Sequence, residues 1–172
     1  MVGGWISISL PGTPVPGTLQ TLFVAMAGVL LGPADGALAA LVYVALGAAG
    51  APVFAQGTGG PGVLLGPTGG YLLAFPVAAA LAGAGYSRRG VGRGWLVLTV
   101  AGSIAGLAVI YALGAGRLAA VVFDGDLPRA LAAGVAPFVV PDLFKLVTVW
   151  LLASAIRSRG FLAEFKAAAR EE

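Results

Sequence analysis

The sequence contains no cysteine and no histidine, and few of its residues are charged. These absences exclude thiol nucleophiles, disulfides, Cys/His metal sites and imidazole acid–base catalysis. Only 10% of the 172 residues are charged and 59% are hydrophobic, whereas soluble domains carry about 25% charged residues. A water-soluble fold of this size cannot bury so much apolar sequence. The composition therefore predicts an integral membrane protein, a single transmembrane domain over residues 1–172, without a metal or cofactor.

Apolar stretches separated by glycine and proline predict the helices. Residues 1–10 are too short to cross a bilayer, which takes about 20 helical residues, and the prolines of segment 11–16 prevent a helix there. We therefore expect an all-α integral membrane fold with five complete spans and the stub of a sixth at the N-terminus. Residues 116–134 would form an interfacial connection, and the tail from Arg157 a short amphipathic helix at the membrane surface. The five expected spans cover residues 19–31, 36–50, 70–85, 95–114 and 137–156.

A glycine-rich stretch, residues 57–75, interrupts this pattern. It holds seven glycines between Gly57 and Gly70, two prolines and no charge. Glycine and proline break helices, and glycine allows the backbone to approach its neighbours closely. In hydrocarbon, non-helical backbone survives only where protein buries it or where it lines a cavity. The stretch is therefore predicted to be an ordered, irregular element beside a bound ligand, with an ordinary loop between two helices as the alternative.

The basic residues predict the orientation. Segment 85–94 carries Arg88, Arg89 and Arg93 without an acidic residue, and the tail from Arg157 carries four basic residues. By the positive-inside rule both segments, and with them the C-terminus, face the cytoplasm. The glycine-rich stretch and the proline segment would then lie outside. The sequence pI of about 9.7 comes from basic residues beside apolar spans, which indicates contact with the lipid bilayer and not with nucleic acid.

Asp142 and Lys145 are the only charged residues inside a predicted span. Asp142 would lie in the first turn of its helix, where the helix dipole favours an anion, and the spacing of three residues places both side chains on one face. Ionisable residues in spans usually face a bundle interior or a cavity and mark a function. A structural ion pair is the alternative. Uncharged hydrogen-bonding groups could come from the glycine-rich side, from Gln56, Thr58, Thr68 and Tyr71, with plain packing or loop capping as the alternative for each.

Four stretches carry a resemblance to a known family. They are LQTLFV at 19–24, the LGP…GAL…YxxLGxxGxPVFA pattern through 31–55, GGPGVLLGPTGGYLLAF at 59–75, and PDLFK at 141–145. Together they resemble the BioY family, the biotin-binding, substrate-specific membrane subunits of energy-coupling factor (ECF) transporters. The resemblance runs from about residue 6 to residue 156, and the GPTGGY core combined with the late D-x-x-K pattern is its specific part.

The resemblance implies a six-helix S-component-like bundle in a prokaryotic plasma membrane, with a biotin site near the external face. It also implies partners, a transmembrane coupling subunit and two ATPase subunits. In this reading Asp142 accepts from the ureido N–H groups of biotin and Lys145 holds its carboxylate. One departure from the family is that only MVGGWISISL precedes the proline segment, so the first helix is expected to be shortened. Members of the family use the first helix to contact the coupling subunit, so we expect that contact to be affected. The candidate substrate-binding residues are Asp142, Lys145, Tyr71, Thr68, Gly69, Gly70, Phe54 and Thr58.

Other functions remain open at this point: an S component for another vitamin, a structural membrane-assembly protein without a ligand, or a small intramembrane enzyme. The enzyme is the weakest of these, because one carboxylate and one amine without histidine, cysteine or a metal cluster make a poor catalytic set. The sequence also lacks a G-x-x-x-x-G-K-[ST] phosphate-binding loop, so any ATP hydrolysis must come from a partner. We therefore expect a transport subunit without catalysis of its own.

The predicted orientation can be tested by labelling. Single cysteines introduced at Ser87 and at Ser158 are both expected to react with a membrane-impermeant maleimide from the cytoplasmic side only. The reason is that two spans separate the two basic segments, which places them on one side of the membrane. Reaction of either cysteine from the outside would overturn the topology.

Overall fold

The computed structural model describes residues 2–86 and 93–158, and this part of the chain is mostly helical. Two short strands, β1 (Ser7–Ile8) and β2 (Gly17–Thr18), pair antiparallel with Ser7 opposite Thr18. They flank the proline segment, and the sequence analysis, which expected helices alone, did not predict them. The α-helices are α1 (Val2–Trp5), α2 (Gln20–Leu31), α3 (Pro33–Ala48), α4 (Pro61–Leu65), α5 (Gly69–Ala82), α6 (Arg93–Val122), α7 (Leu127–Gly134) and α8 (Val139–Ser158), and short 3₁₀ turns lie at Ala55–Gly57 and Gly83–Gly85.

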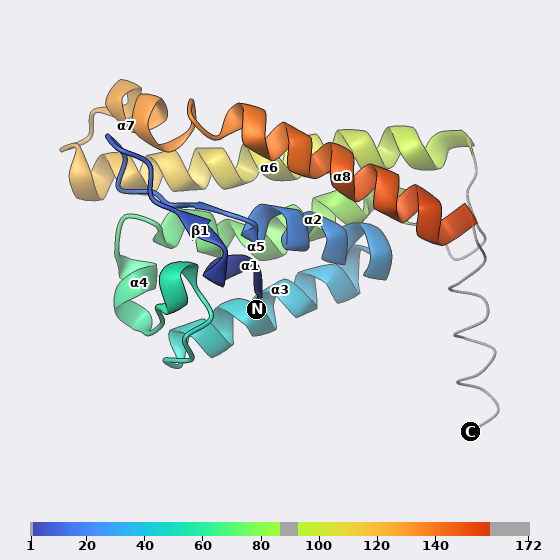
Figure 1. Cartoon of the computed structure of the whole chain (residues 1–172), viewed down its shortest axis with the longest axis horizontal. Helices are drawn as coiled ribbons and strands as arrows, with labels where there is room; N and C mark the ends of the chain where they lie inside the picture. Colours follow the sequence, from blue (N-terminus) through green and yellow to red (C-terminus); the bar gives the residue numbers. More distant parts are fainter. Residues whose placement is uncertain (1, 87–92, 159–172) are drawn as a thin grey trace.

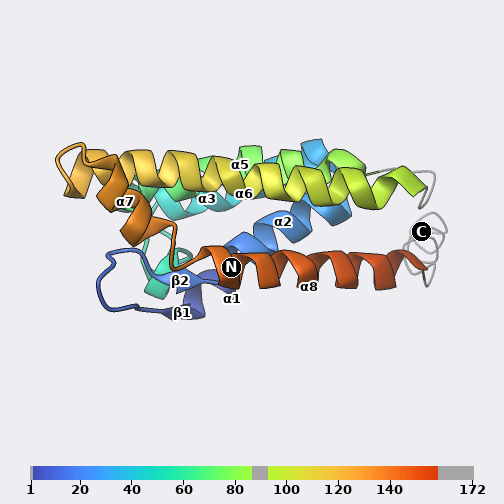
Figure 2. The ribbon, with the colours of Figure 1, turned by 90° about the horizontal axis from the view of Figure 1, so that it is seen from above.

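Helices α2, α3, α5, α6 and α8 lie alongside one another and alternate in direction (Figures 1 and 2). In both views α6 and α8 run along the length of the molecule, and α5 packs against α6, α3 and α2. Figure 1 shows the β1–β2 hairpin, α4 and α7 gathered at one end of this bundle. The proline segment and the glycine-rich stretch, predicted to lie on one side of the membrane, are therefore together at one end.

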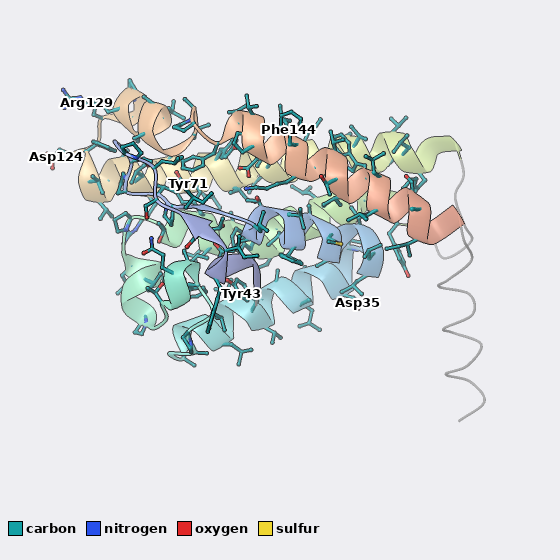
Figure 3. The ribbon with its side chains drawn as sticks, viewed as in Figure 1. Asp35, Tyr43, Tyr71, Asp124, Arg129 and Phe144 are labelled. Atoms are coloured by element: carbon teal, nitrogen blue, oxygen red, sulfur yellow. The ribbon has the colours of Figure 1, made fainter. Side chains whose placement is uncertain are left out.

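Within the described residues, two helical segments, 94–122 and 139–156, are long and apolar enough to cross a membrane. The other apolar helices are shorter: α2 has 12 residues and rises about 18 Å at 1.5 Å per residue. The outward-facing side chains are large and apolar, for example Leu38 on α3, Val97 on α6 and Phe144 on α8. Figure 3 shows Phe144 on the outer face of α8. A lipid environment accounts for such surfaces, because water would not solvate them.

One expected boundary was wrong. Helix α6 continues to Val122, so the first part of the expected connection 116–134 is helical, and Arg117 lies within α6. Its guanidinium donates to the main-chain oxygen of Leu65 and thereby ties α6 to α4. The glycine-rich stretch is also less irregular than expected, because it forms α4 and the start of α5. A proline at the first turn starts α4, since that position needs no backbone N–H partner.

The segment with Arg88 and Arg89 and the tail after Ser158 lie outside the described residues. The expected amphipathic tail helix and the arginine counts on which the orientation depends are therefore not placed by the structure.

Glycines allow α2, α3 and α5 to approach closely. A Cβ added to Gly36 would lie 2.7 Å from the Cα of Gly28, and one added to Gly28 would meet the main-chain oxygen of Ala79 on α5. Small residues at such crossings let helix backbones pack tightly in lipid, where no hydrophobic force drives helices together. Gly116 on α6 is different, because an added Cβ meets no atom within 4 Å.

We predict that Gly28→Ala lowers the thermal unfolding temperature of the detergent-solubilised protein, because the methyl group forces α2 and α5 apart at a cost of about 1–3 kcal/mol. Gly116→Ala is the matched control: it lies in open space within a helix, where alanine is favoured over glycine by up to about 1 kcal/mol, so no loss of stability is expected. Equal effects of the two changes would mean that the close approach at Gly28 contributes nothing.

Candidate functional site

The described residues enclose a cavity of about 230 Å³ beside the hairpin end of the bundle. Its walls come from the N-terminal parts of α2, α5 and α8, from the middle of α6, and from the segments around residues 15–18 and 54–58. The cavity therefore lies where the proline segment and the glycine-rich stretch meet the long helices.

Asp142 and Lys145 form the charged part of this cavity. Helix α8 begins at Val139, so Asp142 lies in its first turn as predicted, where exposed backbone N–H groups and the helix dipole favour a carboxylate. Asp142 is only 4% exposed. The Nζ atom of Lys145 lies 2.7 Å from Oδ1 of Asp142, and the Lys145 side chain is 15% exposed, so the two charges form one ion pair with a buried carboxylate.

Three other residues complete this network. The Thr21 hydroxyl of α2 donates to Oδ1 of Asp142 at 2.9 Å, and the Tyr111 hydroxyl of α6 donates to Oδ2 at 2.8 Å. Lys145 also donates to the main-chain oxygen of Thr18 at 2.5 Å. A buried ion pair is costly unless hydrogen bonds satisfy its remaining groups. This pair meets that condition, and it draws α2, α6 and α8 together.

The rest of the cavity wall is largely apolar. Phe54 is 1% exposed and Phe75 2% exposed, and both line the cavity together with Phe138 of the segment before α8. The ring of Phe54 can approach α3 closely because Gly47 leaves room for it; a Cβ at Gly47 would overlap the ring. The cavity thus combines a charged, hydrogen-bonded part with an aromatic surface, which is typical of a small-molecule site.

Six of the eight predicted residues line the cavity: Asp142, Lys145, Tyr71, Thr68, Phe54 and Thr58. Two of these use their hydroxyl groups on the protein itself, since Tyr71 donates to the main-chain oxygen of Gly134 at 2.8 Å and Thr58 to that of Ala55 at 2.8 Å. Figure 3 shows Tyr71 lying between α5 and the α6–α7 end of the bundle, as this bond requires.

Gly69 and Gly70, the other two predicted residues, do not line the cavity. They begin α5 and are buried against neighbouring backbone. A Cβ at Gly69 would meet the main chain of Leu64, and one at Gly70 would meet that of Leu113. Their position indicates close packing of α5 against α4 and α6.

The sequence analysis did not identify Thr21, Tyr111 or the main-chain oxygen of Thr18. A tyrosine in the middle of an apolar span is a signal that could have been used, because its hydroxyl needs a partner in a dry interior. Thr21 lies in the LQTLFV stretch but had no distinguishing local pattern. Every residue has a main-chain oxygen, so the sequence does not show which of these oxygens accepts a hydrogen bond from Lys145.

The arrangement suits binding of a molecule with a polar head and an apolar body. The described residues contain no group of three or more acidic, histidine or cysteine side chains that could hold a metal ion. The charged pair offers donors and acceptors side by side, and the aromatic surface offers an apolar contact.

Comparisons with known proteins extend this picture. A "Probable biotin transporter BioY" from Pyrococcus horikoshii is 46% identical over 156 residues, which cover 91% of this chain and 88% of that protein. The "Biotin transporter BioY" of Thermotoga maritima is 44% identical over 157 residues, with 91% and 88% covered. The crystal structure of the S-component for biotin from an ECF-type ABC transporter matches with a TM-score of 0.79 and 27% identity, over 91% of this chain and 84% of that one.

The sequence pattern of the BioY family matches residues 1–160, which include all the elements that enclose the cavity. The relatives confirm the resemblance that the GPTGGY and D-x-x-K motifs carry. The chain belongs to the BioY family.

Proposed function

We propose that this protein is the biotin-binding membrane subunit of an ECF-type vitamin transporter, and that it captures biotin and mediates its import. The observation that carries the proposal is that the D-x-x-K pair lines the main cavity of a fold matching a solved S-component for biotin. The relatives are named as transporters, in agreement with the expectation that the chain is not an enzyme. A coupling subunit and two ATPase subunits are the partners that such a function needs, because the sequence has no phosphate-binding loop of its own.

In this proposal the chain is a single substrate-binding domain that passes through the cell membrane several times with its C-terminus in the cytoplasm. Five spans, α2, α3, α5, α6 and α8, together with α1, make up a six-helix bundle. The hairpin end, with the glycine-rich stretch, then faces the outside, and biotin enters the cavity from there.

We propose that the ureido group of biotin binds at the ion pair. A carboxylate has about four acceptor positions, and among the described residues Asp142 uses three of them: Oδ1 receives Thr21 and Lys145, and Oδ2 receives Tyr111. The free position on Oδ2 suits a ureido N–H. The ammonium of Lys145 lies 3.4 Å from the Thr21 hydroxyl. This is a long hydrogen bond, and the ureido oxygen can replace it.

This placement differs from the expectation that Lys145 holds the carboxylate. Lys145 and Asp142 are in direct contact, so one ligand group meets both, and a neutral group with donors and an acceptor matches a neutral pair better than an anion does. The carboxylate then extends toward the hydroxyl of Thr68 and the amide of Gln56 on the glycine-rich side of the cavity. Phe54 and Phe75 cover the apolar bicycle.

We predict that Asp142→Asn and Lys145→Met each weaken equilibrium binding of biotin to the solubilised protein by about ten- to hundred-fold, or 1.5–3 kcal/mol, because each removes a charged hydrogen bond from a dry site. The matched control is the other Asp–cation pair at the same spacing, Asp126 and Arg129, which caps α7 and is exposed. Asp126→Asn should leave biotin binding unchanged. Parent affinity in both cavity variants would leave the pair as a structural salt bridge and remove the argument for this site.

A second measurement tests which end of biotin lies at Lys145. The parent protein and Lys145→Met are each titrated with biotin and with its uncharged amide. If the ureido group lies at the pair, both ligands weaken by a similar factor in the variant, and any preference of the parent for one of them is kept. A preference for biotin that is present in the parent and lost in Lys145→Met would place the carboxylate on Lys145 instead.

A further inference from the structure

A chain of hydrogen bonds leads from the ion pair to the aromatic wall of the cavity. This wall consists of Phe54, Phe75 and Phe138. Thr18 accepts from Lys145 through its main-chain oxygen, and its hydroxyl donates to Oε1 of Gln20 at 2.9 Å. Nε2 of Gln20 donates to the hydroxyl of Tyr43 at 2.6 Å, and this hydroxyl donates to the main-chain oxygen of Val53 at 2.7 Å. The path thus connects α8, through α2 and α3, to the segment that carries Phe54.

Tyr43 does not line the ligand cavity, but it contacts the residues that do. Its ring packs edge-on against Phe54, with centroids 5.7 Å apart, and stacks with Phe75 at 6.4 Å. Its hydroxyl holds Val53, the residue before Phe54. Tyr43 therefore fixes the aromatic wall through its ring and through its hydroxyl; in Figure 3 it is labelled on α3.

A second cavity of about 140 Å³ lies between α1, α2 and α3, and Gln20 and Tyr43 both line it. Gln20 is 8% exposed and lines the ligand cavity as well, so the Gln20–Tyr43 contact separates the two spaces. If these hydrogen bonds are lost, the Tyr43 ring, which contacts Phe54 and Phe75, has this space beside it.

We propose that Gln20 and Tyr43 are positioning residues that hold the aromatic wall at a fixed distance from the Asp142–Lys145 pair and so determine which ligands fit between them. The identity of the ligand rests on the proposed function, but the positioning role does not. A hydroxyl that serves only the stability of the fold would make no difference to the position of the wall or to ligand selectivity, and this distinction can be measured.

The first measurement uses no ligand. Because the chain has no native cysteine, a single Ala55→Cys on the cavity wall, two residues after Val53, reports on this segment alone through its rate of reaction with a small maleimide. We expect Tyr43→Phe and Gln20→Leu each to raise this rate several-fold, since both break the same path. Ser103→Ala is the control: Ser103 is buried and accepts from Nε1 of Trp150 at 3.3 Å, but does not line the ligand cavity. It should lower thermal stability and leave the labelling rate unchanged.

The second measurement compares biotin with desthiobiotin, which keeps the ureido ring and the carboxylate but lacks the sulfur bridge of the bicycle. In Tyr43→Phe, biotin affinity is expected to fall about ten-fold, the loss of one to two buried hydrogen bonds, and desthiobiotin affinity to fall less. The preference of the parent for biotin should therefore shrink in Tyr43→Phe and persist in Ser103→Ala.

The two measurements separate the two proposals. A parent labelling rate and a parent ligand ratio in both Tyr43→Phe and Gln20→Leu would overturn the positioning role, even if both variants lose thermal stability. Faster labelling in these variants, together with no binding of biotin by the parent, would support the positioning role. It would overturn only the proposed function.

Discussion

The ion pair of Asp142 and Lys145, whose carboxylate is buried, is the constraint on which the rest of the site depends. An ammonium and a carboxylate in an apolar bundle are tolerated only if other groups satisfy their remaining hydrogen bonds. Those groups come from α2, as Thr21, from α6, as Tyr111, and from the main chain of Thr18. Meeting this requirement fixes three helices relative to one another and also creates the polar part of the cavity. Stability and recognition thus share one set of contacts.

Glycine has two separate uses in this chain. At Gly28 and Gly36 it lets helices α2, α3 and α5 meet backbone to backbone, which is how helices associate when lipid surrounds them. At Gly69 and Gly70 it lets α5 start directly against α4 and α6. Gly47 likewise makes room for Phe54, whereas Gly57 and Gly60 have no atom within 4 Å of an added Cβ and have positive φ angles instead.

The sequence predicted the parts of the fold and site that depend on local spacing. Asp142 and Lys145 were found because two charges three residues apart stand out in an apolar helix, and Thr68, Tyr71, Phe54 and Thr58 because they accompany the glycine-rich stretch. Gln20, Thr21, Tyr43 and Tyr111 were missed as site residues because their partners depend on how each helix is rotated. In a lipid-facing bundle the outer surface is as apolar as the core, as Leu38, Val97 and Phe144 show, so hydrophobic periodicity does not reveal the rotation. The end of α6 was misplaced for a related reason: Arg117 was taken as a sign of an interfacial loop, whereas its guanidinium bonds within the protein.

The hydrogen bonds that the ion pair makes without a ligand determine how much it can contribute to the free energy of binding. Asp142 and Lys145 already have protein partners, so a ligand that binds there exchanges hydrogen bonds and gains little from them, because the net value of an exchanged bond is about 1 kcal/mol. Burial of apolar surface contributes about 25 cal/mol per Å², and it is reduced by whatever ordering the wall must undergo on binding. A wall that is already fixed, with Phe54 almost fully buried and held through Val53 by Tyr43, loses little entropy at that step. In the proposed site, the charged pair therefore contributes recognition and the aromatic wall contributes affinity, and the hydrogen bonds through Gln20 and Tyr43 keep the wall in position.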